Sequence, residues 1–553
     1  MERSDLPYRA GVSSTLYRHG AVHTSADPFA EALLVEDGTV VWLGADDTAD
    51  GMVSRADEVI DLDGALVAPG FVDAHVHVLE TGLALESVDL SPEAGVHSLA
   101  DALDAVHRAA ASTPAGAPVL GFGWDELRWP EGRPPTREEL DAAAGGALVY
   151  LARVDVHSAV VSSALSRDAG LDLLPGWSFD GRVERDAHHA AREAARAVSP
   201  ERRTALYRRA LAHAAARGVV SVHEHSAPSI DTRAGLVELL ELTADPRGGL
   251  PHLVGYRGEQ CVTVDDAREI LAAIPGLTGI GGDLNVDGSL GSHTAAVRAP
   301  YADAPGDQGV LYLTAEQICN HLTAVTRAGV QGGFHVIGDR AMDELLLGLR
   351  AAVDVEGPDA IARMGHRLEH AEMVDAPTLA ALVLLGVRLS MQPAFDAAWG
   401  GPDGMYATRL GAGRAAALNP LADLAAAGVP LAFGSDSPVT AIDPWAGVRA
   451  AVLHRAADQR ISARAAFRAS TRGGWRVAGL DHTGAGELRV GSPAHLAVWR
   501  AEHLTVQSAE GRFSSWSTDA RAGIPLLPDM SPDAAAPTCL RTVRDGVVLY
   551  DTF

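Results

Sequence analysis

Five side chains that could hold a divalent metal follow apolar runs along the chain. His75 and His77 end the run "LVAPGFVDAHVH", and residues at i and i+2 of a strand point to the same side. His335 lies in "GGFHVIGDRA", His370 in "RLEHAE" and Asp436 in "FGSDSPVT". Zinc and similar ions take imidazole and carboxylate ligands, and a catalytic zinc site commonly keeps one position open. A lone HxH pair is more often a surface or hydrogen-bonded pair, but the ordered set predicts a catalytic metal site.

The elements that must position these residues follow a βα rhythm. Between about residues 67 and 483, short apolar runs alternate with alanine-rich amphipathic segments such as 199–218 and 314–329, each ending at glycine. In a (β/α)8 barrel the active site lies at the carboxyl ends of the strands. We therefore expect a distorted (β/α)8 barrel over 67–483, with the five residues at its mouth. A stretch rich in Trp, Pro and Gly interrupts the rhythm at about 84–200, and we interpret it as an insertion over the barrel mouth.

Both ends of the chain contain short β-like runs separated by Asp-Gly turns. "EALLVEDGTVVWLG" lies near the start and "LRTVRDGVVLYDTF" near the end. Asp-Gly between two such runs is a strong hairpin signal. The pattern predicts that residues 1–66 and 484–553 form one small β domain.

Composition favours a globular protein that binds a small molecule. Against 72 acidic residues stand 45 basic residues, all of them arginine, for a net charge of −27. That charge disfavours nucleic acid and anionic membranes as partners, whereas a homo-oligomer stays open. No apolar run approaches the roughly 20 residues of a membrane span, and the first residues lack a secretory signal pattern. Three widely spaced cysteines fit a reducing compartment, so we expect a cytoplasmic protein.

Several motifs together resemble the amidohydrolase superfamily and, within it, the family-3 amidohydrolases, which include N-substituted formamide deformylases. They are "PGFVDAHVH", "GFGWDE", "DGSLGSHTAA", "HVIGDRA", "RLEHAE", "GSDSPV" and "GELRVGSPAHLAVW". The resemblance implies a distorted (β/α)8 barrel and a β-sandwich assembled from both termini. It also implies that the four histidines are metal ligands or water-orienting groups, and that Asp436 is both a ligand and a general base.

One position departs from that family. Many relatives hold two metals bridged by a carboxylated lysine, but here "GGDLNVDGSLGSHTAA" places Asp283 at that position, and the chain has no lysine. A carboxylated lysine cannot form, and aspartate is several atoms shorter. We therefore predict one divalent ion, most simply Zn²⁺, with His370 orienting the water or the substrate carbonyl. The predicted ligands of that ion are His75, His77, His335 and Asp436. The alternative is a pair of ions bridged by Asp283 and hydroxide.

These residues predict a hydrolase that cleaves the C–N bond of an amide, formamide or other N-acyl compound. Water held by a divalent ion has its pKa lowered from 15.7 towards about 7. Asp436 would accept its proton and later return it to the leaving nitrogen, while His370 or the metal stabilises the oxyanion. The sequence leaves three alternatives open: a deaminase of a heterocyclic or amidine-like substrate, a lyase or isomerase, and a binding protein with an altered metal site.

Three further side chains are candidate substrate contacts. Trp124 and His157 belong to the inserted stretch, and His293 lies in "GSHTAA". An aromatic face could cover a ligand, and an imidazole could bond to one. Each residue fits equally well as part of the structural core or of a local hydrogen bond.

Overall fold

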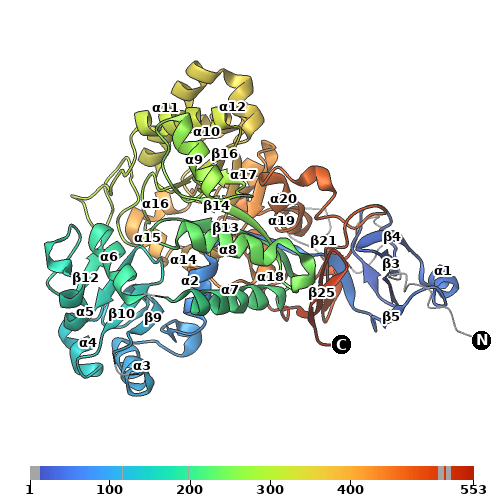
Figure 1. The fold of residues 1–553 in the computed structure, drawn as a ribbon, viewed down its shortest axis with the longest axis horizontal. Helices are drawn as coiled ribbons and strands as arrows, with labels where there is room; N and C mark the ends of the chain where they lie inside the picture. Colours follow the sequence, from blue (N-terminus) through green and yellow to red (C-terminus); the bar gives the residue numbers. More distant parts are fainter. Residues whose placement is uncertain (1–12, 115, 197, 508–515, 518–524) are drawn as a thin grey trace, which may run out of the picture.

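Eight parallel strands form the centre of the molecule (Figure 1). The computed structural model describes residues 13–114, 116–196, 198–507, 516–517 and 525–553. Within them the eight-stranded sheet has the order β19-β18-β17-β16-β15-β14-β13-β7. The strands are β7 (Phe71–Val76), β13 (Val219–Ser226), β14 (His252–Arg257), β15 (Gly279–Ile280), β16 (Gln331–Val336), β17 (Arg367–His370), β18 (Arg388–Met391) and β19 (Leu431–Phe433).

The sheet closes into a barrel between its first and last strands. The Asp436 amide, just after β19, donates to the carbonyl of His75 in β7 at 2.8 Å. A single bridge also joins Val76 to Ser437. The predicted (β/α)8 barrel is therefore confirmed, and its main distortion is β15, which pairs over only two residues.

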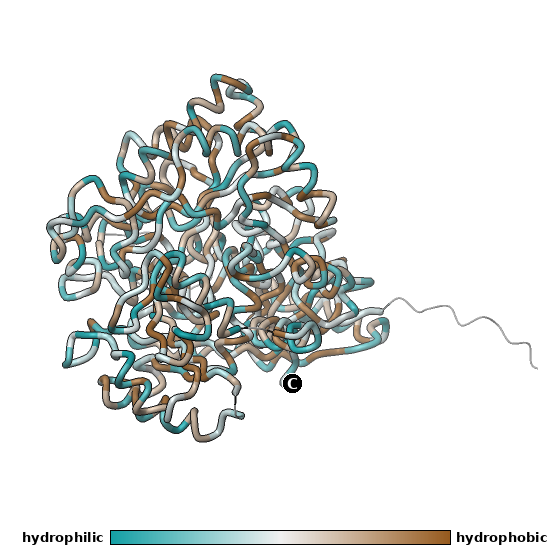
Figure 2. Tube along the Cα trace, turned by 60° about the vertical axis from the view of Figure 1, so that its left-hand side comes forward, coloured by the Kyte–Doolittle hydropathy of each residue, from teal (hydrophilic) through white to brown (hydrophobic). Residues whose placement is uncertain are grey.

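The outer helices begin and end at the signals in the sequence. Helix α7 (Pro200–Ala215) starts after Ser199, whose side chain accepts from the Arg202 amide. Helix α10 (Ala315–Ala328) starts with a capping box and stops at Gly329, which has a left-handed φ of 75°. Hydrophobic and hydrophilic residues are interspersed along the coloured tube in Figure 2. Such mixing is expected of amphipathic helices that bury one face against a barrel. No helix within the described ranges combines the length and apolar character needed to cross a bilayer.

Strands from both ends of the chain share one sheet, beside the barrel on the right of Figure 1. Its order is β2-β6-β20-β24-β25, and β20 pairs antiparallel with β6. A second sheet, β4-β3-β1-β5, packs against it through buried aliphatic side chains. The bounds are β1 (Ser14–Arg18), β2 (Ala21–Val22), β3 (Ala32–Glu36), β4 (Thr39–Gly44), β5 (Glu58–Asp61), β6 (Leu66–Pro69), β20 (Leu496–Arg500), β24 (Thr538–Arg544) and β25 (Val547–Asp551). This is the β-sandwich expected from the two termini, whereas the domain limits of 1–66 with 484–553 stay a prediction.

The inserted stretch folds as a unit of its own, at the lower left of Figure 1. It has a five-stranded sheet of order β12-β11-β10-β9-β8 and separate hydrophobic clusters. Its elements are β8 (Val88–Asp89), α3 (Leu99–Ser112), β9 (Val119–Trp124), α4 (Arg137–Ala143), β10 (Val149–Arg153), β11 (Ser158–Val161), α5 (Ser163–Asp168), β12 (Arg182–Glu184) and α6 (Arg185–Ala195). The loop between β10 and β11 reaches the barrel mouth, where its residues Asp155 and His157 line a cavity together with His335 and His370.

Candidate metal centre

The barrel brings all six predicted metal-site residues together at the carboxyl ends of its strands. His75 lies near the end of β7 and His77 follows it, while His335 and His370 lie at the ends of β16 and β17. The two aspartates follow β15 and β19. The histidines and Asp436 are buried. Burial of this many ionisable groups in one place requires mutual pairing or a bound ion.

Asp283 lies at the centre of the cluster. Its Oδ1 is 3.1 Å from His335 Nδ1, 3.6 Å from His370 Nε2 and 4.0 Å from His75 Nε2. Its Oδ2 is 3.6 Å from His77 Nε2. The aspartate therefore faces all four imidazoles in spite of its short side chain.

Asp436 follows β19, the last strand of the sheet, which lies next to β7 because the barrel is closed. Its carboxylate therefore faces His75 and His77. Its Oδ1 is 3.4 Å from His75 Nε2 and 3.3 Å from His77 Nε2. Burial opposes ionisation of Asp436, but these imidazoles and that of His370 hold the pKa of its carboxyl below the usual value. Asp436 is thus ionised at neutral pH.

In three of the imidazoles, a hydrogen bond made by Nδ1 determines that Nε2 faces the two aspartates. Nδ1 of His75 bonds to Glu369 at 2.8 Å, Nδ1 of His77 to the His225 carbonyl at 2.9 Å, and Nδ1 of His370 to Gln392 Oε1 at 2.8 Å. Since these oxygens only accept, each Nδ1 carries a proton and Nε2 points inward.

The inward nitrogens meet carboxylates rather than donors, and this arrangement fits a bound cation. The Nε2 atom of His75 has no hydrogen-bond partner within the described part of the chain, although it is completely buried. Lone pairs directed at carboxylate oxygens repel them unless a proton or a metal ion lies between. The donor set of imidazoles and carboxylates is the one that zinc prefers.

Protons take the place of an ion on two of the imidazoles when no metal is bound. Burial opposes a charged His77, but the carboxylates of Asp436 and Asp283 outweigh it and raise the pKa of His77 to about 10. The same competition between burial and the two carboxylates raises the pKa of His370 to about 9. Both rings are therefore protonated near neutral pH in the metal-free protein, and each must lose a proton to act as a ligand.

Zinc binding to the metal-free protein should release about two protons per chain near neutral pH, one each from His77 and His370. Titration calorimetry in two buffers with different ionisation enthalpies measures this number. The release should fall towards zero as the pH rises through the pKa values of about 9 and about 10, because both rings are then already neutral. Tight zinc binding with no proton release at neutral pH would contradict this account.

The backbone at the mouth is held in conformations that residues other than glycine rarely adopt. His370, Ala371 and Asp436 have φ values of 69°, 44° and 55°. Such strain costs roughly 1–3 kcal/mol for each residue and concentrates at functional sites. It turns the chain sharply after β17 and β19 and aims the side chains of His370 and Asp436 across the barrel.

A buried ion pair that the sequence reasoning missed supports His75 from below. The guanidinium of Arg367 contacts Glu369 and also donates to the Ala74 carbonyl at 2.8 Å. Both side chains of the pair are completely buried. The signal was present in "RLEH", because the i and i+2 spacing on a barrel strand turns Arg367 and Glu369 to the same interior face. Glu369 orients His75, the first of the predicted ligands, and Arg367 compensates the charge of Glu369.

Aromatic rings complete this layer inside the barrel. The ring of His225 stacks on His75 with centroids 4.0 Å apart, and Tyr256 stacks on the other side of His225 at 5.0 Å. The guanidinium carbon of Arg367 lies 4.5 Å from the centroid of the Tyr256 ring. The layer restricts the orientation of His75 by packing as well as by hydrogen bonding.

A narrow cavity of about 30 Å³ lies beside the histidine cluster. Asp155 and His157 reach it from the inserted domain, and the His157 ring centroid is 5.4 Å from that of His335. Its apolar wall comes largely from α14 (Pro393–Trp399) and α15 (Met405–Leu410). The apolar side chains that line it are Leu290, Ile337, Phe395, Trp399, Met405 and Val439.

The other two candidate substrate contacts do not line this cavity. Trp124 is buried in the core of the inserted domain, where its Nε1 donates to the Leu151 carbonyl at 2.9 Å. His293 is half-buried, with Nε2 3.0 Å from Asp303. Of the three residues proposed from the sequence, the structure brings only His157 to the cavity beside the predicted metal site.

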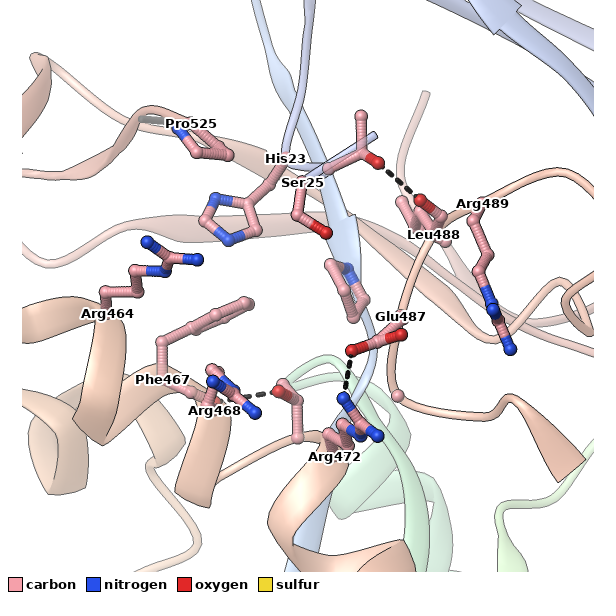
Figure 3. A pocket seen from close by; sticks show the side chains of 14 residues that line it. His23, Ser25, Arg464, Phe467, Arg468, Arg472, Glu487, Leu488, Arg489 and Pro525 are labelled. Carbon is pink, nitrogen blue, oxygen red and sulfur yellow. Dashed lines mark hydrogen bonds and ion pairs between the residues drawn. The ribbon is translucent and has the colours of Figure 1, made fainter. Parts of the chain in front are cut away.

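A larger pocket of about 260 Å³ lies where the composite β domain meets the barrel. Figure 3 shows His23 facing Arg464, Phe467 and Arg468, with an ion pair between Arg472 and Glu487 closing one side. None of the six predicted metal-site residues lines it. Its size alone therefore does not make it the reaction site.

The fold and the site together define a class of protein. A (β/α)8 barrel that gathers histidines and aspartates at its strand ends is the architecture of metal-dependent barrel hydrolases. The chain belongs to the amidohydrolase family, because the profile of that family matches residues 58–550. This confirms the resemblance that the motifs indicated.

Individual relatives agree with that assignment. The chain is 28% identical over 533 residues to Protein LONG AFTER FAR-RED 3 of Arabidopsis thaliana, covering 90% of this chain and 88% of the plant protein. A shorter match, 31% over 157 residues, covers 28% of this chain and 29% of the N-substituted formamide deformylase of Arthrobacter pascens. The crystal structure of an uncharacterized metal-dependent hydrolase from Pyrococcus horikoshii superposes with a TM-score of 0.69 and 27% identity, covering 88% of this chain and 97% of that chain.

Proposed function

We propose that this amidohydrolase cleaves the C–N bond of a small amide, formamide or N-acyl amine. The observation that carries the proposal is the position of Asp436, which contacts the inward nitrogens of His75 and His77 and also lines the cavity. One carboxylate can therefore reach both the predicted metal site and a substrate. The Arthrobacter pascens relative is an N-substituted formamide deformylase, which supports the same type of reaction.

The buried cluster would hold the metal, which we propose to be zinc. When bound, the ion supplies a Lewis acid and lowers the pKa of water towards about 7. The residues that would hold it are His75, His77, His335, His370, Asp283 and Asp436. The bond from His370 Nδ1 to Gln392 leaves its Nε2 facing Asp283, which favours a ligand role for His370 over hydrogen bonding to the oxyanion.

Proton transfer is assigned to Asp436. Since its pKa is held low, the carboxylate is ready to accept a proton from the attacking water at neutral pH. The same proton is then delivered to the leaving nitrogen, so one residue serves both steps. His157 also lines the cavity, where burial lowers its pKa to about 4, and it meets the substrate as a neutral imidazole.

The cavity wall favours substrates without a carboxylate. No arginine is among its lining residues within the described chain, and Asp155 is already paired with Arg153 at 3.1 Å. Glu372 is buried in the wall, and its Oε2 has no hydrogen-bond partner among the described residues. Burial raises the pKa of Glu372 to about 7. A carboxylate brought to this wall by a substrate would lie near Glu372 and would find no arginine to pair with.

Zinc-loaded protein should release a primary amine from N-formyl and N-acetyl derivatives of simple aralkyl amines, and metal-free protein should not. The same amides carrying an added α-carboxylate should react with a kcat/KM at least about tenfold lower, which corresponds to roughly 1.4 kcal/mol. An amine-specific fluorescent reagent measures both rates. Ammonia release from heterocyclic amines, with no amide hydrolysis across such a panel, would overturn the proposal in favour of a deaminase.

A further inference from the structure

We infer that Asp283 bridges two divalent ions in this centre. Two of the candidate metal groups in the described residues contain Asp283: His75, His77 and Asp283 form one, and Asp283, His335 and His370 form the other. These two share only Asp283, whereas a third group, of His75, His370 and Asp436, takes one histidine from each. The two oxygens of Asp283 point mainly to different groups: Oδ2 is 3.6 Å from His77 Nε2, whereas Oδ1 is 3.1 Å from His335 and 3.6 Å from His370, and farther from His75, at 4.0 Å. A carboxylate that offers one oxygen to each group has the placement of a bridging ligand.

The number of inward-facing groups exceeds what one ion uses. A single zinc ion takes four ligands, and a catalytic one commonly takes about three from the protein. Four imidazoles and two carboxylates converge here. One ion with four ligands would leave at least two of these six groups without a metal bond, and a carboxylate left over in this largely buried place would need another counter-charge. Two ions give every group a partner, and the shared anion offsets their repulsion.

Glycines explain how an aspartate reaches the centre. A Cβ atom at Gly281 would lie 2.2 Å from the Gly333 carbonyl oxygen, and one at Gly333 would lie 2.5 Å from the Gly282 nitrogen. Gly281 and Gly282 also have left-handed φ values of 109° and 71°. With no side chains between them, the loop after β15 lies directly against β16. The backbone approach compensates for the short side chain.

Pairing of the same loop with β16 then fixes Asp283 in place. The His335 amide donates to the Leu284 carbonyl at 3.1 Å, and the Val286 amide donates to the His335 carbonyl at 2.9 Å. Asp283 is therefore held next to His335 by backbone hydrogen bonds on its carboxyl-terminal side. The prediction of a single ion assumed that the aspartate side chain is too short to replace a carboxylated lysine. The close approach of this loop to β16 places Asp283 within reach of the centre, so that assumption no longer holds.

Counting bound metal tests the inference directly. Metal-free protein is reloaded with Zn²⁺, freed of excess ion and measured by plasma mass spectrometry. We expect two equivalents per chain, with or without bicarbonate, and no more than one in Asp283→Ala and in the isosteric Asp283→Asn. The matched control is Asp265→Asn, the same change at an exposed aspartate on helix α9 (Val264–Ala273), which should keep two equivalents. With Mn²⁺, the native protein should give the electron paramagnetic resonance spectrum of a coupled pair, and the variants should not.

Some results would overturn it. One tight equivalent in the native protein, two equivalents retained in both Asp283 variants, or a requirement for bicarbonate would each do so. Thermal melting of the metal-free variants checks that they fold, and the two substitutions guard against one of them failing. The inference rests on the proposed function only for the place of the metal site. A protein that binds two ions yet cleaves no amide would refute the function and leave the bridge intact.

Discussion

Replacing Asp436 by asparagine should lower kcat about 10²–10⁴-fold for any amide that the native protein hydrolyses, the range of general acid-base catalysis. The amide keeps the size of the side chain but accepts no proton. Since Asp436 also faces His75 and His77, part of the loss could come from weaker metal binding. Rates must therefore be measured on Asp436→Asn reloaded to the native metal content.

Two comparisons make the result specific. Asp265→Asn should retain native kcat, because it alters only an exposed carboxylate on the outer surface. If metal-loaded Asp436→Asn hydrolyses at the native rate, the proton passes through another group, and Asp436 is only a ligand.

Arg367→Met should destabilise the metal-free barrel by about 3–5 kcal/mol, the usual cost of breaking a buried ion pair by removing one partner. The change leaves the buried Glu369 carboxylate without its guanidinium partner, with the imidazoles of His75 and His225 as its remaining neighbours. Urea unfolding at neutral pH, followed by the fluorescence of the barrel tryptophans, measures the loss. Metal affinity should also fall roughly 10–100-fold, as it does when partners that orient ligands are disturbed.

A double variant separates charge from packing. Arg367→Met with Glu369→Gln removes both charges, so it should recover at least half of the lost stability. Arg367, with His225 and His75, overcomes burial and holds the pKa of Glu369 well below its usual value. The native advantage is therefore present at neutral pH and is lost as the pH falls through that lowered pKa. An Arg367→Met protein as stable as the native chain would show that water or a rearranged histidine pairs with Glu369.

The sequence predicted the barrel, and it predicted that the candidate metal-site residues lie together, because both follow from local pattern. Parallel strands in a closed barrel end at the same face, so polar residues that follow successive apolar runs must meet there. His75, His77, His335, His370 and Asp436 all obey this rule. No knowledge of packing between strands was needed to place them together.

The remaining features depend on contacts that pattern does not encode. The hydrogen bond between His75 and Glu369 joins strands β7 and β17, which are far apart in the chain. This bond crosses the interior of the barrel, and local pattern does not predict it. The position of Asp283 depends on how closely the glycine backbones approach each other. A comparison of side-chain lengths alone therefore underestimates how far the aspartate reaches. Trp124 and His293 lie in stretches without a regular repeat, where proximity to the cavity cannot be read from spacing. The cytoplasmic location, the oligomeric state and the metal identity stay predictions.

The pairing of β6 with β20 has a consequence for the order of assembly during synthesis. β6 leads through a single residue, Gly70, into β7, the strand that carries His75. The edge of β6 that faces β20 stays without its partner until residues 496–499 have left the ribosome. This happens more than 400 residues after β6 itself is made. The barrel strand that carries the first residue of the proposed metal site is thus anchored by a segment translated near the end, so nascent chains expose an unpaired strand edge until then. Chaperone dependence of the nascent chain is the expected result of this topology.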